Sequence, residues 1–234
     1  MQNDHGAFAV QIKRLEFSWT ANTAINFTDN TLSIPDLTVK TGDKLFVEGQ
    51  SGSGKSTLLN IIAGILCPQQ GEVSILGTDL SPLSAIERDR FRANHMGVIF
   101  QQFNLLPYLT VRENIRLSRL FVTDKSRTLS DLEPLLEALN LSSDLIERKA
   151  SQLSIGQQQR VGVARALYHR PPLIIADEPT SALDTRNRNE FIELLLEQAA
   201  AFGTTVLFVS HDQSLAQHFD RSVSMDALKE GAVC

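Results

Sequence analysis

Cysteine is scarce in this sequence of 234 residues: there are two, Cys67 and Cys234, and no CxxC pair or Cys/His cluster. Structural zinc sites need such clusters, so the sequence predicts none, and two isolated thiols are typical of a reduced protein.

Long apolar runs are also missing. A membrane-spanning helix needs roughly 20 apolar residues in succession. The N-terminus lacks the basic start and apolar stretch of a signal peptide. We therefore expect neither a transmembrane helix nor a signal peptide.

The chain has no excess of positive charge. Lysine and arginine number 22 against 27 aspartates and glutamates, which gives a formal net charge of −5. Proteins that bind nucleic acid directly usually carry a basic face or tail, so we expect no direct nucleic-acid partner. The hydrophobic fraction of 42% is ordinary for a globular protein, and a chain of this length can bury a full core. These values predict one domain over residues 1–234.

Strand-like and helix-like segments alternate along most of the chain, which predicts an α/β fold with a parallel sheet covered by helices on both faces. Residues 1–48 are strand-rich instead, and residues from about 102 to 151 are rich in helices, which indicates an inserted helical segment. The expected strands are Phe8–Ile12, Leu15–Trp19, Thr31–Val39, Gly71–Leu76, Gly97–Phe100, Leu173–Ala176, Thr205–Ser210 and Ser222–Met225. The expected helices are Ser56–Leu66 (ended by Pro68), Ser84–Asn94, Val111–Leu120, Ser130–Asn140, Ser142–Lys149, Gln157–Leu167, Asn187–Phe202 and Gln213–His218.

A glycine-rich loop follows the apolar segment Leu45–Glu48. It reads GQSGSGKS, which fits the phosphate-binding pattern GxxxxGK[ST], and an apolar-periodic helix follows, as the motif requires. Glycines let successive backbone N–H groups face one anion, to which the positive end of the following helix adds. Lys55 would supply a mobile cation for the β- and γ-phosphates of a nucleoside triphosphate, and the Ser56 hydroxyl can bind Mg²⁺. The phosphate-binding residues expected here are Gly49, Ser51, Gly52, Ser53, Gly54, Lys55, Ser56 and Thr57.

Two acids end a second apolar strand, in the segment Leu173–Glu178. Ligands in open α/β sheets lie at the carboxyl ends of the strands, so these acids would face the same site as the loop. We expect Asp177 to bind Mg²⁺, directly or through water, and Glu178 to orient and deprotonate the attacking water. The alternative is that both acids are solvated or cap a helix, an interpretation that the loop on the same sheet disfavours.

Further motifs follow the loop in a fixed order. Gln101 ends the Gly97–Phe100 strand, and LSIGQ starts at Leu153, SALD at Ser181 and SHD at Ser210. Together with the loop, these motifs resemble those of the ABC ATPase family over essentially the whole chain. The resemblance implies a P-loop NTPase (RecA-like) core with a parallel sheet, an N-terminal antiparallel β subdomain and an inserted helical subdomain. The core with its β subdomain would take about residues 1–101 and 152–234, and the helical subdomain about 102–151.

The resemblance implies ATP and Mg²⁺ as ligands, and it gives roles to Trp19, Gln101 and His211. Trp19 would stack on adenine, which suits a large aromatic face, although a lone tryptophan also packs at a rim. Gln101 would bind the metal and sense a membrane partner, with Gln102 as the alternative. His211 would hold the γ-phosphate and the attacking water, or else cap the strand end. We expect His169 and the remaining histidines to be surface or packing residues.

The LSIGQ motif would act on ATP held by a second subunit. By the resemblance, Ser154, Gly156 and Gln157 would bind the γ-phosphate of that ATP and Asp184 would contact the partner, so that two identical chains pair head to tail around two ATP molecules. The family motif usually reads LSGGQ, and Ile155 stands in place of its first glycine. A β-branched residue does not readily take a positive φ, so the substitution is tolerated if this position has ordinary helix-entry angles. We expect a functional site.

The stretch Arg92–Pro107 and its continuation Leu109–Asn114 resemble the ATPase subunits of lipoprotein-releasing and macrolide-exporter systems. In that group a dimer of ATPases drives an integral membrane permease by mechanical motion, which implies a peripheral position on the cytoplasmic face of the inner membrane. The permease would contact the region of Gln101–Leu109 and the inserted helical segment. Polar amino-acid importers have a similar stretch and remain an alternative, as does a soluble ABC ATPase of cofactor assembly. A module that only binds nucleotide would not need Glu178.

Overall fold

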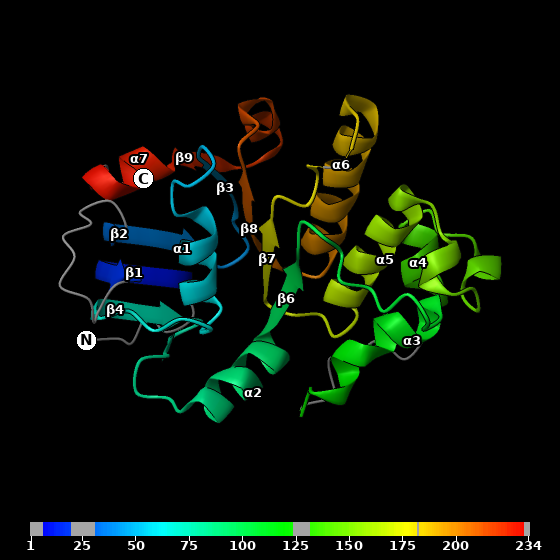
Figure 1. Ribbon diagram of the computed structural model, residues 1–234, viewed down its shortest axis with the longest axis horizontal. Coiled ribbons are helices and arrows are strands. Elements are labelled where there is room, and N and C mark those ends of the chain that lie inside the picture. The colour runs from blue at the N-terminus through cyan, green and yellow to red at the C-terminus, as the bar shows by residue number, and fades with distance from the viewer. Residues whose placement is uncertain (1–6, 20–30, 124–131, 182, 232–234) are drawn as a thin grey trace.

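Two β-sheets form the frame of the protein (Figure 1), whose computed structural model describes residues 7–19, 31–123, 132–181 and 183–231. The antiparallel sheet has the strand order β2-β1-β4-β5, and the parallel sheet has the order β6-β7-β8-β3-β9. This arrangement confirms the predicted α/β class with one antiparallel and one parallel sheet. The strands are β1 (Phe8–Ser18), β2 (Thr31–Lys40), β3 (Lys44–Glu48), β4 (Gln70–Ile75), β5 (Thr78–Asp79), β6 (Met96–Ile99), β7 (Leu173–Asp177), β8 (Thr205–Ser210) and β9 (Arg221–Ser224).

Helices cover both faces of the parallel sheet. Figure 1 shows α1 beside the antiparallel sheet, with α5 and α6 on the other side of the parallel strands. The helices are α1 (Lys55–Ile62), α2 (Ala85–His95), α3 (Val111–Arg116), α4 (Glu133–Ala138), α5 (Ile155–Leu167), α6 (Thr185–Ala201) and α7 (Met225–Glu230). Short 3-10 helices span Leu117–Leu120, Ser143–Leu145, Ala150–Gln152 and Gln213–His218. No helix in the described ranges is long and apolar enough to cross a membrane.

Each central strand of the parallel sheet sends alternate residues into two separate hydrophobic cores. In β3, Leu45 and Val47 join the core that contains α1 and the antiparallel sheet, whereas Phe46 joins the core that contains α3, α5 and α6. The same alternation separates Leu207 from Phe208 in β8. A strand that is buried on both faces therefore reads as a continuous apolar run, and this is why such runs predict the central strands correctly.

Side-chain caps fix where α2, α3, α5 and α6 begin. Ser84, Thr110 and Ser154 form capping boxes at the starts of α2, α3 and α5, in which the cap hydroxyl accepts from the backbone N–H three residues on and a Glu or Gln there accepts from the cap N–H. At α6, the Asp184 carboxylate accepts from the backbone N–H of Asn187 at 2.9 Å. Two of these caps, Ser154 and Asp184, are also predicted ligand-binding or partner-contacting residues.

Several predicted element boundaries are wrong. Helix α1 ends at Ile62 rather than Leu66, because Gly64 takes a left-handed φ of 66° and stops the helix before Pro68. The expected helix Ser142–Lys149 contains only a 3-10 turn, because the backbone N–H groups of Val111 and Arg112 pair with carbonyls of that segment. The expected helix Val111–Leu120 divides into α3 and a 3-10 helix, and Gln213–His218 is 3-10 rather than α.

Other differences lie near the two ends of the chain and at the start of α4. The segments Phe8–Ile12 and Leu15–Trp19 form one strand, β1, which ends at Ser18 and pairs along its length with β2. The last predicted strand ends at Ser224, which caps the unpredicted helix α7 by accepting from the N–H of Ala227. Ser130, the expected start of a helix, lies outside the described residues, and α4 begins at Glu133.

Candidate functional site

The predicted phosphate-binding and acidic residues gather at the carboxyl ends of four parallel strands. The glycine-rich loop follows β3, Gln101 follows β6, Glu178 follows β7 and His211 follows β8, and these strands are neighbours in the sheet. They line one open pocket of about 660 Å³, together with Ser51, Gly52, Gly54, Lys55, Ser56, Thr57 and Asp177. Gln102, the alternative to Gln101, is not among the residues that line it. The fold thus brings together residues that are more than a hundred positions apart.

Glycines shape the loop in two different ways. Gly52 and Gly54 have φ angles of 81° and 101°, a region that other residues rarely adopt. Gly49 is required for space instead, because a Cβ there would lie 2.5 Å from Ser53 Oγ and 2.9 Å from Met225 Cγ. The Ser53 hydroxyl is buried and has no hydrogen-bond partner among the described residues. An oxygen-rich anion held by the loop would satisfy it.

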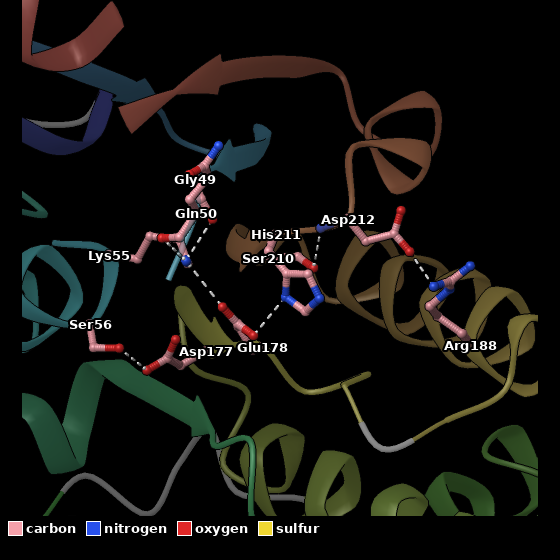
Figure 2. A network of polar contacts seen from close by, with 10 residues as sticks. All are labelled: Gly49, Gln50, Lys55, Ser56, Asp177, Glu178, Arg188, Ser210, His211 and Asp212. Atoms are coloured by element: carbon pink, nitrogen blue, oxygen red, sulfur yellow. Dashed lines mark hydrogen bonds and ion pairs between the residues drawn. The ribbon is translucent and has the colours of Figure 1, made fainter. Parts of the chain in front are cut away.

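Lys55 is only 5% exposed. Three oxygen atoms contact its ammonium in the pocket. Its Nζ donates hydrogen bonds to the carbonyls of Gly49 at 2.6 Å and Gln50 at 2.8 Å, and it lies 3.1 Å from Glu178 Oε1 (Figure 2). Burying an ammonium without a partner is costly, so these contacts stabilise its charge. The lysine is therefore pre-positioned at the loop rather than free in solvent.

Ser56 and Asp177 both line the pocket and are in direct contact. The Ser56 hydroxyl donates to Asp177 Oδ2 at 2.9 Å. Burial raises the pKa of Asp177, and the nearby Glu178 raises it further, while Ser56 and Lys55 act in the opposite direction. A hydroxyl and a carboxylate in contact are the oxygen ligands that Mg²⁺ prefers. Within the described part of the chain no group of three or more His, Cys, Asp or Glu could hold a metal by itself, so phosphate oxygens or water would have to complete a Mg²⁺ site.

Glu178 is held by contacts on both of its carboxylate oxygens. One faces Lys55, and Oε2 lies 2.9 Å from His211 Nδ1 (Figure 2). Its backbone has a positive φ of 45° while its N–H donates to the Val209 carbonyl of β8. A non-glycine residue in this region is uncommon and is often found at functional sites. The geometry aims one carboxylate between a lysine and a histidine.

The LSIGQ residues lie in a different pocket. Ser154, Gly156, Gln157 and Asp184 line a cavity of about 560 Å³ at the start of α5, which shares no lining residue with the glycine-rich loop. Ile155 is the first residue of α5, does not have a positive φ, and is 58% exposed. This position therefore has ordinary helix-entry angles, the condition under which isoleucine is tolerated there. A single chain does not bring the LSIGQ motif to its own loop.

Trp19 lies at the end of β1, 58% exposed, with its ring edge-on to that of Phe17 at 5.2 Å between centroids. It lines a small cavity of about 80 Å³ with Ser53, Gly54 and Thr57 of the loop and with Lys229 of α7. Sequence reasoning missed Lys229, because it lies in an unpredicted helix and belongs to no motif. The pairing of Glu178 with both Lys55 and His211 was also missed, since no sequence spacing encodes it.

Comparisons with known proteins point to one family. A family model described as ABC transporter matches residues 32–181. The lipoprotein-releasing system ATP-binding protein LolD of Shewanella frigidimarina is 40% identical over 199 residues, which cover 85% of this chain and 83% of the relative. The macrolide export ATP-binding/permease protein MacB of Rhodopirellula baltica is 38% identical over 84% of this chain, which spans only 29% of that relative's length. The dimeric post-hydrolysis structure of the ATP-binding cassette MJ0796 from Methanocaldococcus jannaschii, with ADP and Pi, matches with a TM-score of 0.77 and 34% identity over 95% of each chain.

Proposed function

The chain belongs to the ABC transporter family, whose cassettes are ATPases, and we propose that two copies of it bind and hydrolyse ATP to drive a separate membrane permease. The observation that carries this proposal is the convergence of Lys55, Ser56, Asp177, Glu178 and His211 at one end of the parallel sheet. Lysine and loop N–H groups suit a polyphosphate, while a carboxylate and a histidine in contact suit the activation of water.

In the proposed reaction each of these side chains has one task. Lys55 and the loop N–H groups bind and orient the β- and γ-phosphates. Glu178 accepts a proton from the water that attacks the γ-phosphorus, and His211, 2.9 Å from Glu178, positions the carboxylate and the water. Charge on the transferred phosphoryl group is met by donors that are already fixed in place. Trp19 supports the adenine ring by stacking.

The residues in contact on the pocket floor fit a Mg²⁺ ion. Ser56 and Asp177 would hold it, and Gln101, which lines the same pocket, would reach it from the end of β6. The ion would neutralise charge on the β- and γ-phosphates.

A second copy of the chain is part of the proposal because the LSIGQ pocket is separate from the loop. Head-to-tail pairing would bring Ser154, Gly156 and Gln157 of one chain to the γ-phosphate bound by the other, with Asp184 at the contact. Support comes from the relative MJ0796, which is described as a dimer.

The permease partner is proposed to be of the exporter or mechanotransmission type, with the ATPase pair on the cytoplasmic face of the inner membrane. Relatives whose names join ATP-binding and permease functions, and the lipoprotein-releasing relative, support this assignment. The exposed side chains of Phe100, Tyr108, Leu120 and Phe121 provide apolar surface near the region expected to contact the permease.

Two measurements test the proposal. Glu178→Gln should abolish ATP turnover and trap an ATP-bound dimer that gel filtration detects. Turnover at the wild-type rate would contradict the role of Glu178.

Gentle solubilisation of membranes should co-purify a permease with few spans and a large extracytoplasmic domain. A many-span importer permease would change the subclass, and purely soluble partners would contradict the transport function.

A further inference from the structure

The cavity beside Trp19 adjoins the phosphate-binding pocket. Gly52, Gly54 and Thr57 line both, so the two spaces share one wall made of the loop and the start of α1. Lys55, Glu178 and His211 line only the larger pocket, while Trp19 and Lys229 line only the small cavity. The site thus has a phosphate end and a Trp19 end, and Lys229 belongs to the latter.

Helix α7 places Lys229 firmly at this end. Met225 and Leu228 are buried in the core that contains α1 and the antiparallel sheet. Met225 also lies directly against the loop, because a Cβ on Gly49 would be 2.9 Å from its Cγ and one on Gly54 would be 3.7 Å from its Cε. A packed helix that carries Lys229 one residue after Leu228 restricts where its ammonium can reach.

The charge of Lys229 is unmatched in the cavity. The side chain is partly exposed, and in the described ranges it has no hydrogen bond or ion pair. Every other described residue that lines the cavity is uncharged, and the buried Ser53 hydroxyl there has no partner either. Lys55 differs, since its charge is balanced by Glu178 at 3.1 Å. An ammonium with three donors and no counter-charge beside a phosphate-binding loop favours an anionic ligand.

We propose that Lys229 is a nucleotide-binding residue whose ammonium pairs with the α-phosphate of the bound nucleotide. This inference rests on the proposed function, in which the base lies on Trp19 and the β- and γ-phosphates lie at Lys55. The α-phosphate is then the charged group nearest the Trp19 end. Because ATP and ADP share the α-phosphate, Lys229 contributes equally to the binding of both, unlike a residue that contacts the γ-phosphate.

The test is equilibrium titration calorimetry of the full chain with ATP and with ADP. Lys229→Met should weaken both by the same factor, about tenfold, the size of one charge-assisted hydrogen bond. Lys229→Arg should stay close to wild type. The matched control is Lys13→Met, which removes an equal charge from an exposed position on β1 that lines no part of either pocket; it should bind both nucleotides as wild type does. Circular dichroism checks that each variant is folded.

Four outcomes would contradict parts of this scheme, and they are distinguishable. Unchanged affinities in Lys229→Met would overturn the inference while leaving the proposed function intact. Equal weakening by Lys13→Met would mean a general charge effect and would overturn it too. Weakening of ATP alone would place Lys229 at the γ-phosphate and not the α-phosphate. A wild-type chain that binds neither nucleotide would remove the proposed function itself.

Discussion

Lys55 Nζ and Glu178 Oε1 lie 3.1 Å apart, so the ammonium at the phosphate-binding loop is paired with the carboxylate proposed to activate water. A phosphate oxygen and the Glu178 carboxylate therefore compete for the same lysine. The remaining donors of Lys55 are engaged by the carbonyls of Gly49 and Gln50, which keep it in place whichever anion it meets. Binding of phosphate to Lys55 would free Glu178 Oε1 to contact water, while Oε2 keeps its contact with His211.

This competition predicts that Glu178→Gln binds ADP more tightly than wild type in the absence of Mg²⁺. The amide keeps the size of the side chain but removes the charge that competes with phosphate. We expect a gain of about fivefold, or about 1 kcal/mol, in titrations with EDTA present.

The control for this prediction is Asp177→Asn, which removes an equal charge from the same pocket. Asp177 is bonded to Ser56 and not to Lys55, so its substitution should tighten ADP binding less. Equal gains in both variants would indicate general repulsion between carboxylates and phosphate rather than competition for Lys55.

Ser154 is proposed to act both as a helix cap and as a ligand of the partner's ATP, and the two roles are separable. Ser154→Ala and Ser84→Ala each remove one capping box, so each should lower the free energy of unfolding by about 1 kcal/mol. Only Ser154→Ala should also lower the ATPase rate steeply, because Ser84 lies outside both pockets. Denaturant unfolding and a phosphate-release assay measure the two effects. Similar rates in both variants would leave Ser154 with a structural role only.

Ile155 should be compatible with catalysis. It begins α5 without a positive φ and is largely exposed, so the isoleucine strains neither the helix nor the core. We expect the wild-type chain to hydrolyse ATP and Ile155→Gly to change the rate little, while losing up to about 0.5 kcal/mol of stability from its lower helix propensity. An inactive wild-type chain that Ile155→Gly activates would contradict this expectation.

His169 makes stability depend on pH. Burial lowers the pKa of His169 from 6.5 to about 4. Because the folded pKa lies below the unfolded one, the folded state binds fewer protons, and stability is lost as the pH falls from 6.5 towards 4. Between pH 7 and pH 5 this loss amounts to about 2 kcal/mol.

The measurement is urea unfolding at both pH values, with His169→Phe as the comparison. Phenylalanine keeps an aromatic ring in the site but does not titrate, so that variant should lose less stability than wild type between pH 7 and pH 5. Parallel losses in the two proteins would assign the pH dependence to other groups.

The sequence predicts those parts of the site that depend on local backbone geometry. The glycine-rich loop, the acids after β7 and His211 after β8 each follow an apolar strand, and parallel strands place their carboxyl ends together. Contacts made by tertiary packing could not be predicted in this way. The hydrogen bonds from Val111 and Arg112 that prevent a helix over Ser142–Lys149 join segments some thirty-five residues apart. Helix α7 and Lys229 were missed because six residues carry too little periodicity to distinguish a helix from a strand end.

The alternation of residues along the central strands also has an evolutionary consequence. Phe46 and Val47 are neighbours in the chain yet contribute to different cores, one beneath α3, α5 and α6 and the other beneath α1. Substitutions on the side of α3, α5 and α6 can therefore accumulate with little effect on the packing that supports the glycine-rich loop. A lineage can therefore change the outer surface of these helices, including the part proposed to contact a permease, while the core beneath α1 and the glycine-rich loop stays the same.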